Sequence, residues 1–203
     1  TAVITLDEAG LWTDGRYFLQ ADKQLEGTTI TLRKMGEPGV PTIPEYLAEA
    51  LPSGGTLGVD GRVISVNTGD EYEKIAADKG GKIQYHQDLI DQIWTDRPEL
   101  SREPVFALGV EYAGETTESK LTRIREEMKK NHADKHVLTT LDDICWTLNI
   151  RGNDIIYNPV VMSYVMVTME QVHFYVQEEA VSEQVRAELE KAGVVIILQF
   201  MKT

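Results

Sequence analysis

The sequence predicts an α/β fold divided into two domains. Short segments rich in β-branched residues alternate with helical segments, and glycine or proline marks most of the joints, which is typical of layered α/β proteins. A polar stretch with two prolines, residues 95–104, interrupts this alternation near the middle of the chain. Few contacts are expected to cross such a segment. The sequence therefore predicts one domain over residues 1–97 and a second over residues 98–203.

The first domain is predicted to open with a hairpin. Residues 2–5 and 10–12 are strand-like and flank the acidic turn Asp7-Glu8-Ala9. Thr42 is expected to cap a helix together with Glu45, because a threonine followed three residues later by glutamate forms a capping box. The remaining expected elements are a helix over 17–25, a strand over 28–34, a strand over 57–60, a helix over 65–79, a strand over 82–85 and a helical turn over 89–94.

The second domain is predicted to follow the same logic. Ser182 is expected to cap its last helix, and residues 160–168 and 172–176 to form a hairpin. Asp142 is expected to cap a turn that begins at Ile144. The other expected elements are an apolar segment over 105–108, a helix over 118–131, a strand over 136–139, helical turns over 141–148 and a closing apolar run, VVIILQFMKT, over 194–203.

A faint internal repeat links the two halves. The order strand, acidic turn, strand occurs in AVITLDEAGLWTD and again in YVMVTMEQVHFYVQ. If the halves are duplicates, the first copy lacks the helix and strand that precede the second hairpin. The chain is therefore expected to be a fragment at its beginning, and also at its end, where an apolar run is followed by nothing that would cover it.

Composition excludes several partners. The formal charge is −13 and the isoelectric point near 4.7, so the chain is expected to be repelled by nucleic acid. The longest apolar run, Val194 to Leu198, is far too short to span a bilayer, so no membrane association is expected. Cys145 is the only cysteine, which rules out an internal disulfide within the sequence and suits a cytoplasmic location.

Residues that could carry out catalysis do not gather in the sequence. The four histidines are scattered, and although His132 and His136 share helical spacing, the residues between them read as a turn into a strand. Asp142 and Asp143 are adjacent and point in different directions on a helix, which favours capping over acid/base work. Cys145 lies between Ile144 and Trp146 on an apolar face, where a thiol is inert.

Two arginines and one asparagine are the candidate substrate-binding residues. Arg16 follows a tight turn at Gly15, and its guanidinium either pairs with Asp14 or binds a substrate carboxylate or carbonyl. Arg151 lies in a polar loop that also contains Asn158. Either internal arginine–aspartate and asparagine–backbone bonds hold this loop in place, or its polar side chains are available to bind a ligand.

Five motifs in order carry a family resemblance: LWTDGRYFLQA, IWTDRP, LDDICW, NIRGNDI and YNPVVMSY. They resemble the front two domains of three-domain cytosolic aminopeptidases P, which remove the N-terminal residue from peptides with proline in second position. The resemblance implies two creatinase N-terminal-like domains, related to the ribonuclease H-like fold, with mixed sheets, the first of them truncated before Thr1. It also implies that Arg16 reaches a neighbouring subunit's active site, and that the loop of Arg151 and Asn158 faces the cleft.

The resemblance assigns the chemistry to a later domain. In this family a C-terminal metallopeptidase domain holds two metal ions, usually manganese, and that domain is not in this sequence. The chain is thus expected to be a non-catalytic N-terminal portion, without a cofactor of its own, which shapes substrate access and supports a homodimer. The alternative is a stand-alone binding module that recognises peptides or a protein without hydrolysing them.

Overall fold

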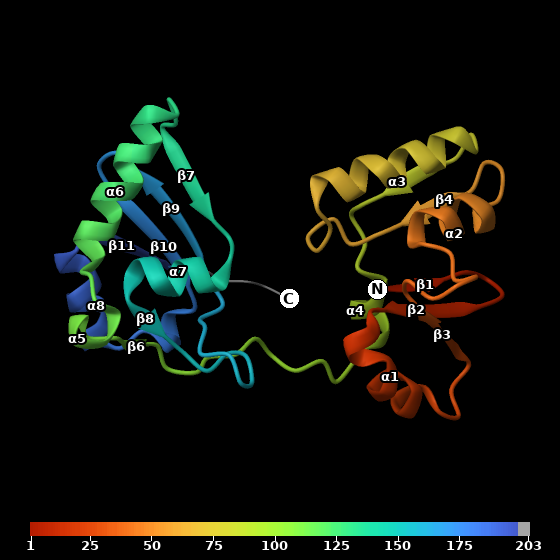
Figure 1. The fold of residues 1–203 in the computed structure, drawn as a ribbon, viewed down its shortest axis with the longest axis horizontal. Helices are drawn as coiled ribbons and strands as arrows, with labels where there is room; N and C mark the ends of the chain where they lie inside the picture. The colour runs from red at the N-terminus through yellow and green to blue at the C-terminus, as the bar shows by residue number, and fades with distance from the viewer. Residues whose placement is uncertain (199–203) are drawn as a thin grey trace. The chain divides into compact units, whose positions relative to one another are not determined.

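The computed structural model describes residues 1–198 and contains two compact units (Figure 1). The first comprises Thr1–Arg97, and the second begins at Pro98. Each unit combines helices with parallel and antiparallel strand pairs. The predicted α/β class with mixed sheets is therefore confirmed.

The first unit begins with the expected hairpin. Strand β1 (Ala2–Ile4) pairs antiparallel with β2 (Ala9–Thr13), and β2 pairs parallel with β3 (Ile30–Lys34). A parallel neighbour requires a crossover, which the 3-10 turn η1 (Gly15–Tyr17) and helix α1 (Phe18–Leu25) provide. The sheet order is β1-β2-β3, so β1 is an edge strand.

Trp12 anchors one face of this sheet. Its side chain is 1% exposed, its ring centroid lies 4.9 Å from that of Tyr46, and its Nε1–H donates to the carbonyl oxygen of Pro41 at 2.8 Å. Tyr46 belongs to α2 (Ile43–Ala50), whose predicted capping box between Thr42 and Glu45 is present in both directions. Burying a tryptophan with its N–H satisfied stabilises the packing of α2 on the sheet.

A second, two-stranded sheet completes the first unit. Strands β4 (Thr56–Gly58) and β5 (Lys82–Gln84) run parallel and are connected by α3 (Val66–Asp78), which Ser65 caps. The short helix α4 (Leu89–Ile93) follows. Gly81 approaches the neighbouring turn so closely that a β-carbon there would lie 2.2 Å from the carbonyl oxygen of Gly55.

The second unit is built on a four-stranded sheet of order β11-β10-β9-β7. Strands β9 (Tyr164–Thr168) and β10 (Val172–Val176) form the predicted hairpin, and β7 (Lys135–Leu138) pairs antiparallel with β9. Strand β11 (Val194–Leu198) lies parallel to β10 and is reached through α8 (Glu183–Lys191), which Ser182 caps as expected.

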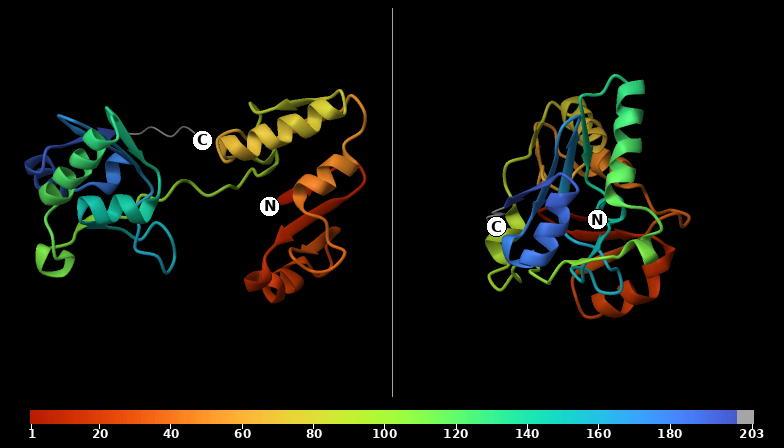
Figure 2. Two further views of the ribbon diagram at one scale, coloured as in Figure 1. Left: turned by 45° about the horizontal axis from the view of Figure 1, so that its top comes forward. Right: turned by 90° about the vertical axis from the view of Figure 1, so that its left-hand side faces the viewer.

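The core of the second unit lies on one face of that sheet. Helices α6 (Thr117–Lys130), α7 (Leu141–Leu148) and α8 contribute apolar side chains to a single buried cluster with β9 and β10 (Figures 1 and 2). Alternate residues Val165, Val167, Val172, Phe174 and Val176 supply the sheet side of this cluster, and all are at most 1% exposed. The alternation follows from the two-residue period of a strand.

Both units contain the same arrangement of a hairpin, a helix and a parallel third strand. In the first unit it is β1, β2, α1 and β3; in the second it is β9, β10, α8 and β11. In the second unit β7 extends this arrangement on the outer side of β9. The repeat suggested by the sequence is thus also visible in the topology.

Several elements differ from the sequence prediction. Helix α7 begins at Leu141, after a Thr140 N-cap without a side-chain bond, so Asp142 does not cap a turn at Ile144. Asp142 instead lies in the first helical turn, where the helix dipole favours a carboxylate. Residues 160–163 are not part of the strand, because Met162 donates its N–H to Asp154 Oδ2 rather than to a neighbouring strand.

Four short elements were not predicted: β6 (Phe106–Ala107), α5 (Val110–Ala113), β8 (Ile150–Arg151) and η2 (Glu178–Ala180). Strands β6 and β8 pair antiparallel and bring distant parts of the second unit together. Of the predicted closing run, residues 199–203 lie outside the described residues.

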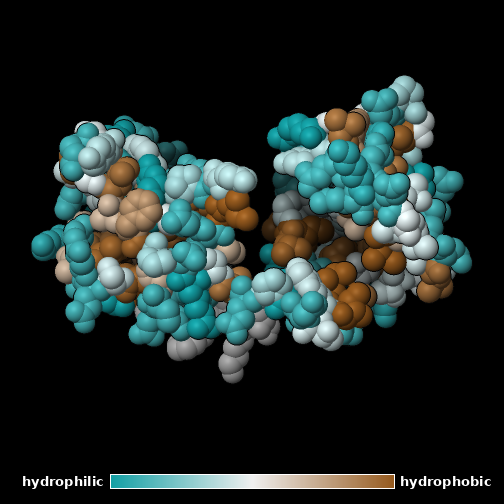
Figure 3. All heavy atoms as spheres, turned by 90° about the horizontal axis from the view of Figure 1, so that it is seen from below, coloured by the Kyte–Doolittle hydropathy of each residue, from teal (hydrophilic) through white to brown (hydrophobic). Residues whose placement is uncertain are grey.

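Large apolar side chains remain on the surface of the first unit. Leu6 is fully exposed, Leu19 is 81% exposed and Ile4 is 67% exposed. Figure 3 shows apolar side chains at the surface in the view from below.

Candidate functional site

Arg16 lies at the surface between β2 and α1. Its Nε and Nη2 donate to the two carboxylate oxygens of Asp14, each at 2.9 Å, and its backbone N–H also bonds to Asp14. The Arg16 side chain is 80% exposed. The pairing with Asp14 therefore exists, and it leaves Nη1 for another acceptor. A guanidinium held in this way is preoriented for a carboxylate or carbonyl.

The local charge state of this pair is fixed by its hydrogen bonds. Side-chain hydrogen bonding from Arg16 is the main reason that the pKa of Asp14 falls from 3.8 to about 2. The same bonds raise the pKa of Arg16. Both groups are therefore charged at neutral pH.

The hydrogen bonds of Arg151 go to backbone carbonyl groups and not to an aspartate, the partner considered in the sequence analysis. Its Nη1 donates to the carbonyl oxygens of Cys145 at 3.0 Å and Ile150 at 2.7 Å. Among the described residues, Arg151 forms no ion pair with an aspartate, so the arginine–aspartate bond, one of the two alternatives drawn from the sequence, is wrong for this residue. Arg151 instead bonds the carbonyl of Cys145, in the last turn of α7, where the helix dipole favours a positive charge, and that of Ile150 in β8.

Asn158 lies at the far end of the same loop as Arg151. The two arms of the loop are joined by bonds from Gly152 N–H to Pro159 O and from Asp154 N–H to Val160 O, each at 3.4 Å. Asn158 uses its backbone N–H to bond Ile155 O at 3.1 Å. Tyr157 beside it has a φ of 66° and is fully exposed, so the loop displays an aromatic ring in a strained backbone conformation.

The candidate residues therefore fall into two groups. Arg16 belongs to the first compact unit, while Arg151 and Asn158 share one loop of the second. Cys145 is 2% exposed, and burial raises the pKa of its thiol, as expected for an inert cysteine.

A buried lysine was missed by the sequence reasoning. Lys120 is 1% exposed and donates to Trp146 O at 2.7 Å and to Asn149 Oδ1 at 2.6 Å. Burial of the ammonium lowers the pKa of Lys120. Asn149 ends α7 in the left-handed conformation, with φ at 51°, and bonds back to Glu115 O. Lys120 thus binds the carbonyl end of α7, and its position four residues before Ile124, which packs against the core, was the available signal in the sequence.

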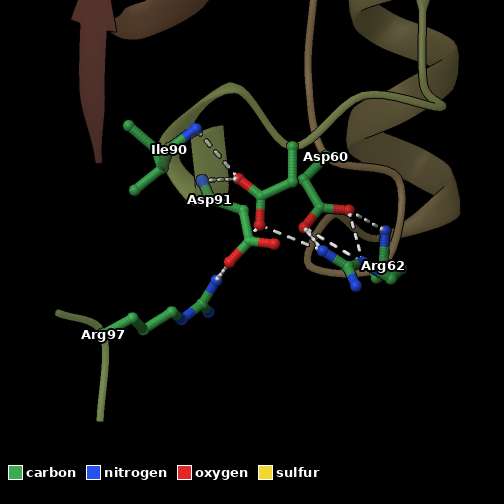
Figure 4. A network of polar contacts seen from close by, with 6 residues as sticks. Asp60, Arg62, Ile90, Asp91 and Arg97 are labelled. Atoms are coloured by element: carbon green, nitrogen blue, oxygen red, sulfur yellow. Dashed lines mark hydrogen bonds and ion pairs between the residues drawn. The ribbon is translucent and has the colours of Figure 1, made fainter. Parts of the chain in front are cut away.

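A second missed feature is the ionic network in the first unit. Arg62 pairs with Asp60 at 2.9 Å and Asp88 at 3.0 Å, and Arg97 pairs with Asp88 at 3.2 Å and Asp91 at 3.0 Å (Figure 4). Asp88 also caps α4. Backbone N–H donation from Asp91 is the first reason that the pKa of Asp88 is lowered. The network borders a surface hollow of about 550 Å³ that also contains His86 and Tyr85.

The described residues offer no set of ligands for a metal ion. Within residues 1–198, no three His, Cys, Asp or Glu side chains converge in that way. His132 follows α6 with a φ of 53° and His136 lies on β7, so the two do not share a helix. In the described part of the chain, no helix is long and apolar enough to cross a bilayer.

Together the fold and these sites define a tandem pair of α/β domains, with Arg16 in η1 of the first and Arg151 at the end of β8 in the second. Residues 1–93 match the family model for the creatinase/prolidase N-terminal domain. Residues 96–199 match a second family model with the same description. The chain belongs to the creatinase/prolidase N-terminal domain family and carries two such domains in succession.

The similar proteins are aminopeptidases. The Xaa-Pro aminopeptidase app-1 of Caenorhabditis elegans is 40% identical over 96% of this chain, and Aminopeptidase P2 of Arabidopsis thaliana is 38% identical over 96%. A crystal structure of X-prolyl aminopeptidase from Caenorhabditis elegans, described as a cytosolic enzyme with a di-nuclear active site, superposes with a TM-score of 0.90 at 40% identity over 97% of this chain. The predicted resemblance is therefore confirmed.

The match covers only the front part of these proteins. The chain spans 32% of the Caenorhabditis elegans protein and 28% of the Arabidopsis thaliana protein. It spans 32% of the chain in the crystal structure. Since the described residues lack a metal-ligand cluster, they do not fit the di-nuclear centre of that enzyme.

Proposed function

We propose that this chain is the non-catalytic N-terminal part of an Xaa-Pro aminopeptidase. The observation that carries the proposal is that the two family matches lie in tandem across nearly the whole chain, with 40% identity to an Xaa-Pro aminopeptidase. The parent enzyme removes the residue before proline, works in the cytoplasm as a homodimer and holds two manganese ions in its metallopeptidase domain. The two domains described here shape access to its cleft.

Within this function, Arg16 binds the peptide substrate. Its support is geometric: the guanidinium is exposed, is held in place by Asp14 and retains donors for a carbonyl. In the second domain, the loop that contains Arg151 and Asn158 also takes part in peptide binding. Because Arg151 Nη1 bonds two carbonyl groups, Arg151 orients the loop, while the side-chain amide of Asn158 meets the peptide.

A cleavage assay tests the main proposal. The 203-residue chain, supplied with manganese, is expected to release no arginine from Arg-Pro-Pro, whereas a longer protein that continues into the metallopeptidase domain is expected to release it. Release by the short chain would overturn the proposal. Inactivity of the longer protein, with a stoichiometric metal content, would favour a stand-alone binding module.

Arg16→Ala and Arg16→Lys, made in the longer enzyme, test the substrate role. Loss of one charged hydrogen-bond donor group is expected to lower kcat/KM by roughly 10-fold or more, as such bonds contribute about 1.5–3 kcal/mol. Arg16→Lys is expected to retain more kcat/KM than Arg16→Ala but less than the unaltered enzyme, since lysine lacks the planar guanidinium with its paired N–H donors. Unchanged kinetics at unchanged metal content would exclude Arg16 from substrate binding.

A further inference from the structure

Residues 94–104 join the two units and form neither a helix nor a strand. Helix α4 ends at Ile93, and the next strand, β6, begins at Phe106. Near the end of this joint, Val105 N–H donates to the carbonyl oxygen of Ala180 at 2.8 Å, which ties the backbone to the second unit. Movement is the default expectation where a polar, proline-containing segment joins compact domains. The points at which each end of the joint is held therefore decide how much of it is flexible.

Arg97 holds the first end of this joint. Its Nη1 donates to Asp88 Oδ2 at 3.2 Å and to Asp91 Oδ1 at 3.0 Å (Figure 4). Its guanidinium also lies 5.5 Å from the centre of the Trp94 ring. Asp88 accepts a further bond from Arg62 at 3.0 Å, and this bond links the group to the body of the first unit. We call Arg97 with its partners Asp88, Asp91 and Trp94 the first clasp.

The first clasp accounts for the residues of the motif IWTDRP, which spans residues 93–98. The N–H of Arg97 donates to the carbonyl oxygen of Trp94 at 3.2 Å, which closes a turn beneath their stacked side chains. Pro98 has no N–H and disfavours a helical conformation of the residue before it, so the turn cannot continue. The segment that is held to the first unit therefore ends at Arg97.

Arg102 holds the second end of the joint. Its Nη1 donates to Glu179 Oε1 at 3.4 Å, and its Nη2 donates to Glu99 Oε2 at 3.1 Å. Glu179 belongs to η2 of the second unit, whereas Glu99 lies within the joint itself. Within residues 1–198, one long ion pair thus attaches this second clasp, Arg102 with Glu179. Arg97 is 40% exposed and Arg102 is 54% exposed, so dissolved salt screens the ion pairs of both clasps.

We propose that the two clasps confine the hinge between the domains to residues 98–101, and that ionic strength sets the length of this hinge by opening the first clasp. With both clasps closed, four residues lie between Arg97 and Arg102. When the first clasp opens, residues 94–97 are freed as well, and the flexible stretch doubles to the eight residues 94–101. Each added residue extends its reach by at most about 3.6 Å. This device is a property of the joint and is independent of peptidase activity.

Limited digestion with chymotrypsin, which cleaves after aromatic residues and leucine, tests where the hinge lies. Leu100 lies inside the proposed hinge, and Trp94 lies inside the first clasp. Mass spectrometry of the fragments gives the cleavage rate at each bond, which is divided by the rate for the same bond in a synthetic peptide of residues 89–104. In dilute buffer, this relative rate is expected to be higher after Leu100 than after Trp94.

Arg97→Gln is expected to raise the rate after Trp94 by roughly 2- to 5-fold, the range that exposed ion pairs contribute, because cleavage follows the population of the open form. The rate after Leu100 is expected to stay unchanged. Arg123→Gln is the matched control, since it removes an exposed ion pair to Glu115 that lies outside the joint. Neither rate should change in that variant.

Salt supplies a test that needs no substitution. In about 1 M sodium chloride the Debye length falls to roughly 3 Å, so the rate after Trp94 in the unaltered chain is expected to rise to that of Arg97→Gln. The same salt should change the rate in Arg97→Gln very little, because its first clasp is already open. Equal relative rates after Trp94 and Leu100 in dilute buffer, or a salt effect of the same size in both chains, would overturn the proposal.

Discussion

Lys120 binds Trp146 in two ways at once. Its ammonium lies 4.2 Å from the centre of the indole ring and donates a hydrogen bond to the carbonyl oxygen of the same residue. The third contact, to Asn149 Oδ1, holds the residue that ends α7. One buried charge from α6 thereby fixes the C-terminal end of the neighbouring helix.

Lys120→Met is expected to destabilise the chain by about 1–3 kcal/mol, because the carbonyl of Trp146 and the amide of Asn149 lose their charged donor. Lys130→Met on the same helix is the control. Lys130 is exposed and, within residues 1–198, pairs with Glu127 alone, so its replacement is expected to change stability by less than about 0.5 kcal/mol. Urea unfolding measures both, and equal effects would refute the role given to Lys120.

The stability contributed by Lys120 is expected to vary with pH in the alkaline range. Burial lowers its pKa in the folded state below 10.5, so the unfolded chain binds its proton more tightly. Protonation therefore opposes folding below the folded-state pKa, and this penalty disappears as pH rises toward 10.5. The difference in stability between the unaltered chain and Lys120→Met should change across that window; a constant difference would contradict the shift.

Gly81→Ala is expected to destabilise the first unit by roughly 1–3 kcal/mol, the usual cost of forcing extra volume into a packed region. The added β-carbon would lie 2.2 Å from the backbone oxygen of Gly55, which no side-chain rotation can relieve. Gly58→Ala is the matched control, since nothing lies within 4 Å of its β-carbon position. Thermal unfolding of the two variants should separate them clearly, and similar midpoints would argue against this packing.

Asp88→Ala is expected to destabilise α4, because Asp88 accepts hydrogen bonds from the backbone N–H groups of Ile90 and Asp91. The variant also loses the ion pairs of Asp88 with Arg62 and Arg97. Loss of the cap should cost about 1 kcal/mol. Hydrogen exchange at residues 89–93 should accelerate. Asp91→Asn removes only a surface ion pair to Arg97, so exchange in that variant should stay close to the original.

Local signals explain what the sequence could predict. The Thr42 capping box and the Ser182 cap involve residues three apart, and the two hairpins close over a few residues. By contrast, β6 and β8 are two residues each, and Phe106 pairs with Arg151 far along the chain. No periodicity can be read in so short a strand, so neither was predicted.

For the same reason, only part of the candidate site could be predicted from the sequence. The bond between Arg16 and Asp14 lies within one turn and was among the alternatives considered. The contacts of Lys120 join α6 to α7, and a lysine in a helix normally indicates a solvated face. The bonds of Arg151 to carbonyl groups depend on where α7 ends, which sequence alone fixes poorly.

The strand pairing of the first unit bears on how the chain folds during synthesis. Every pair in its two named sheets joins residues between Ala2 and Gln84, and each parallel pair is connected by a nearby helix. These pairings can all form once that stretch has left the ribosome, before the second unit has been translated. Forming these pairings early shortens the time during which apolar strands of both domains are exposed together.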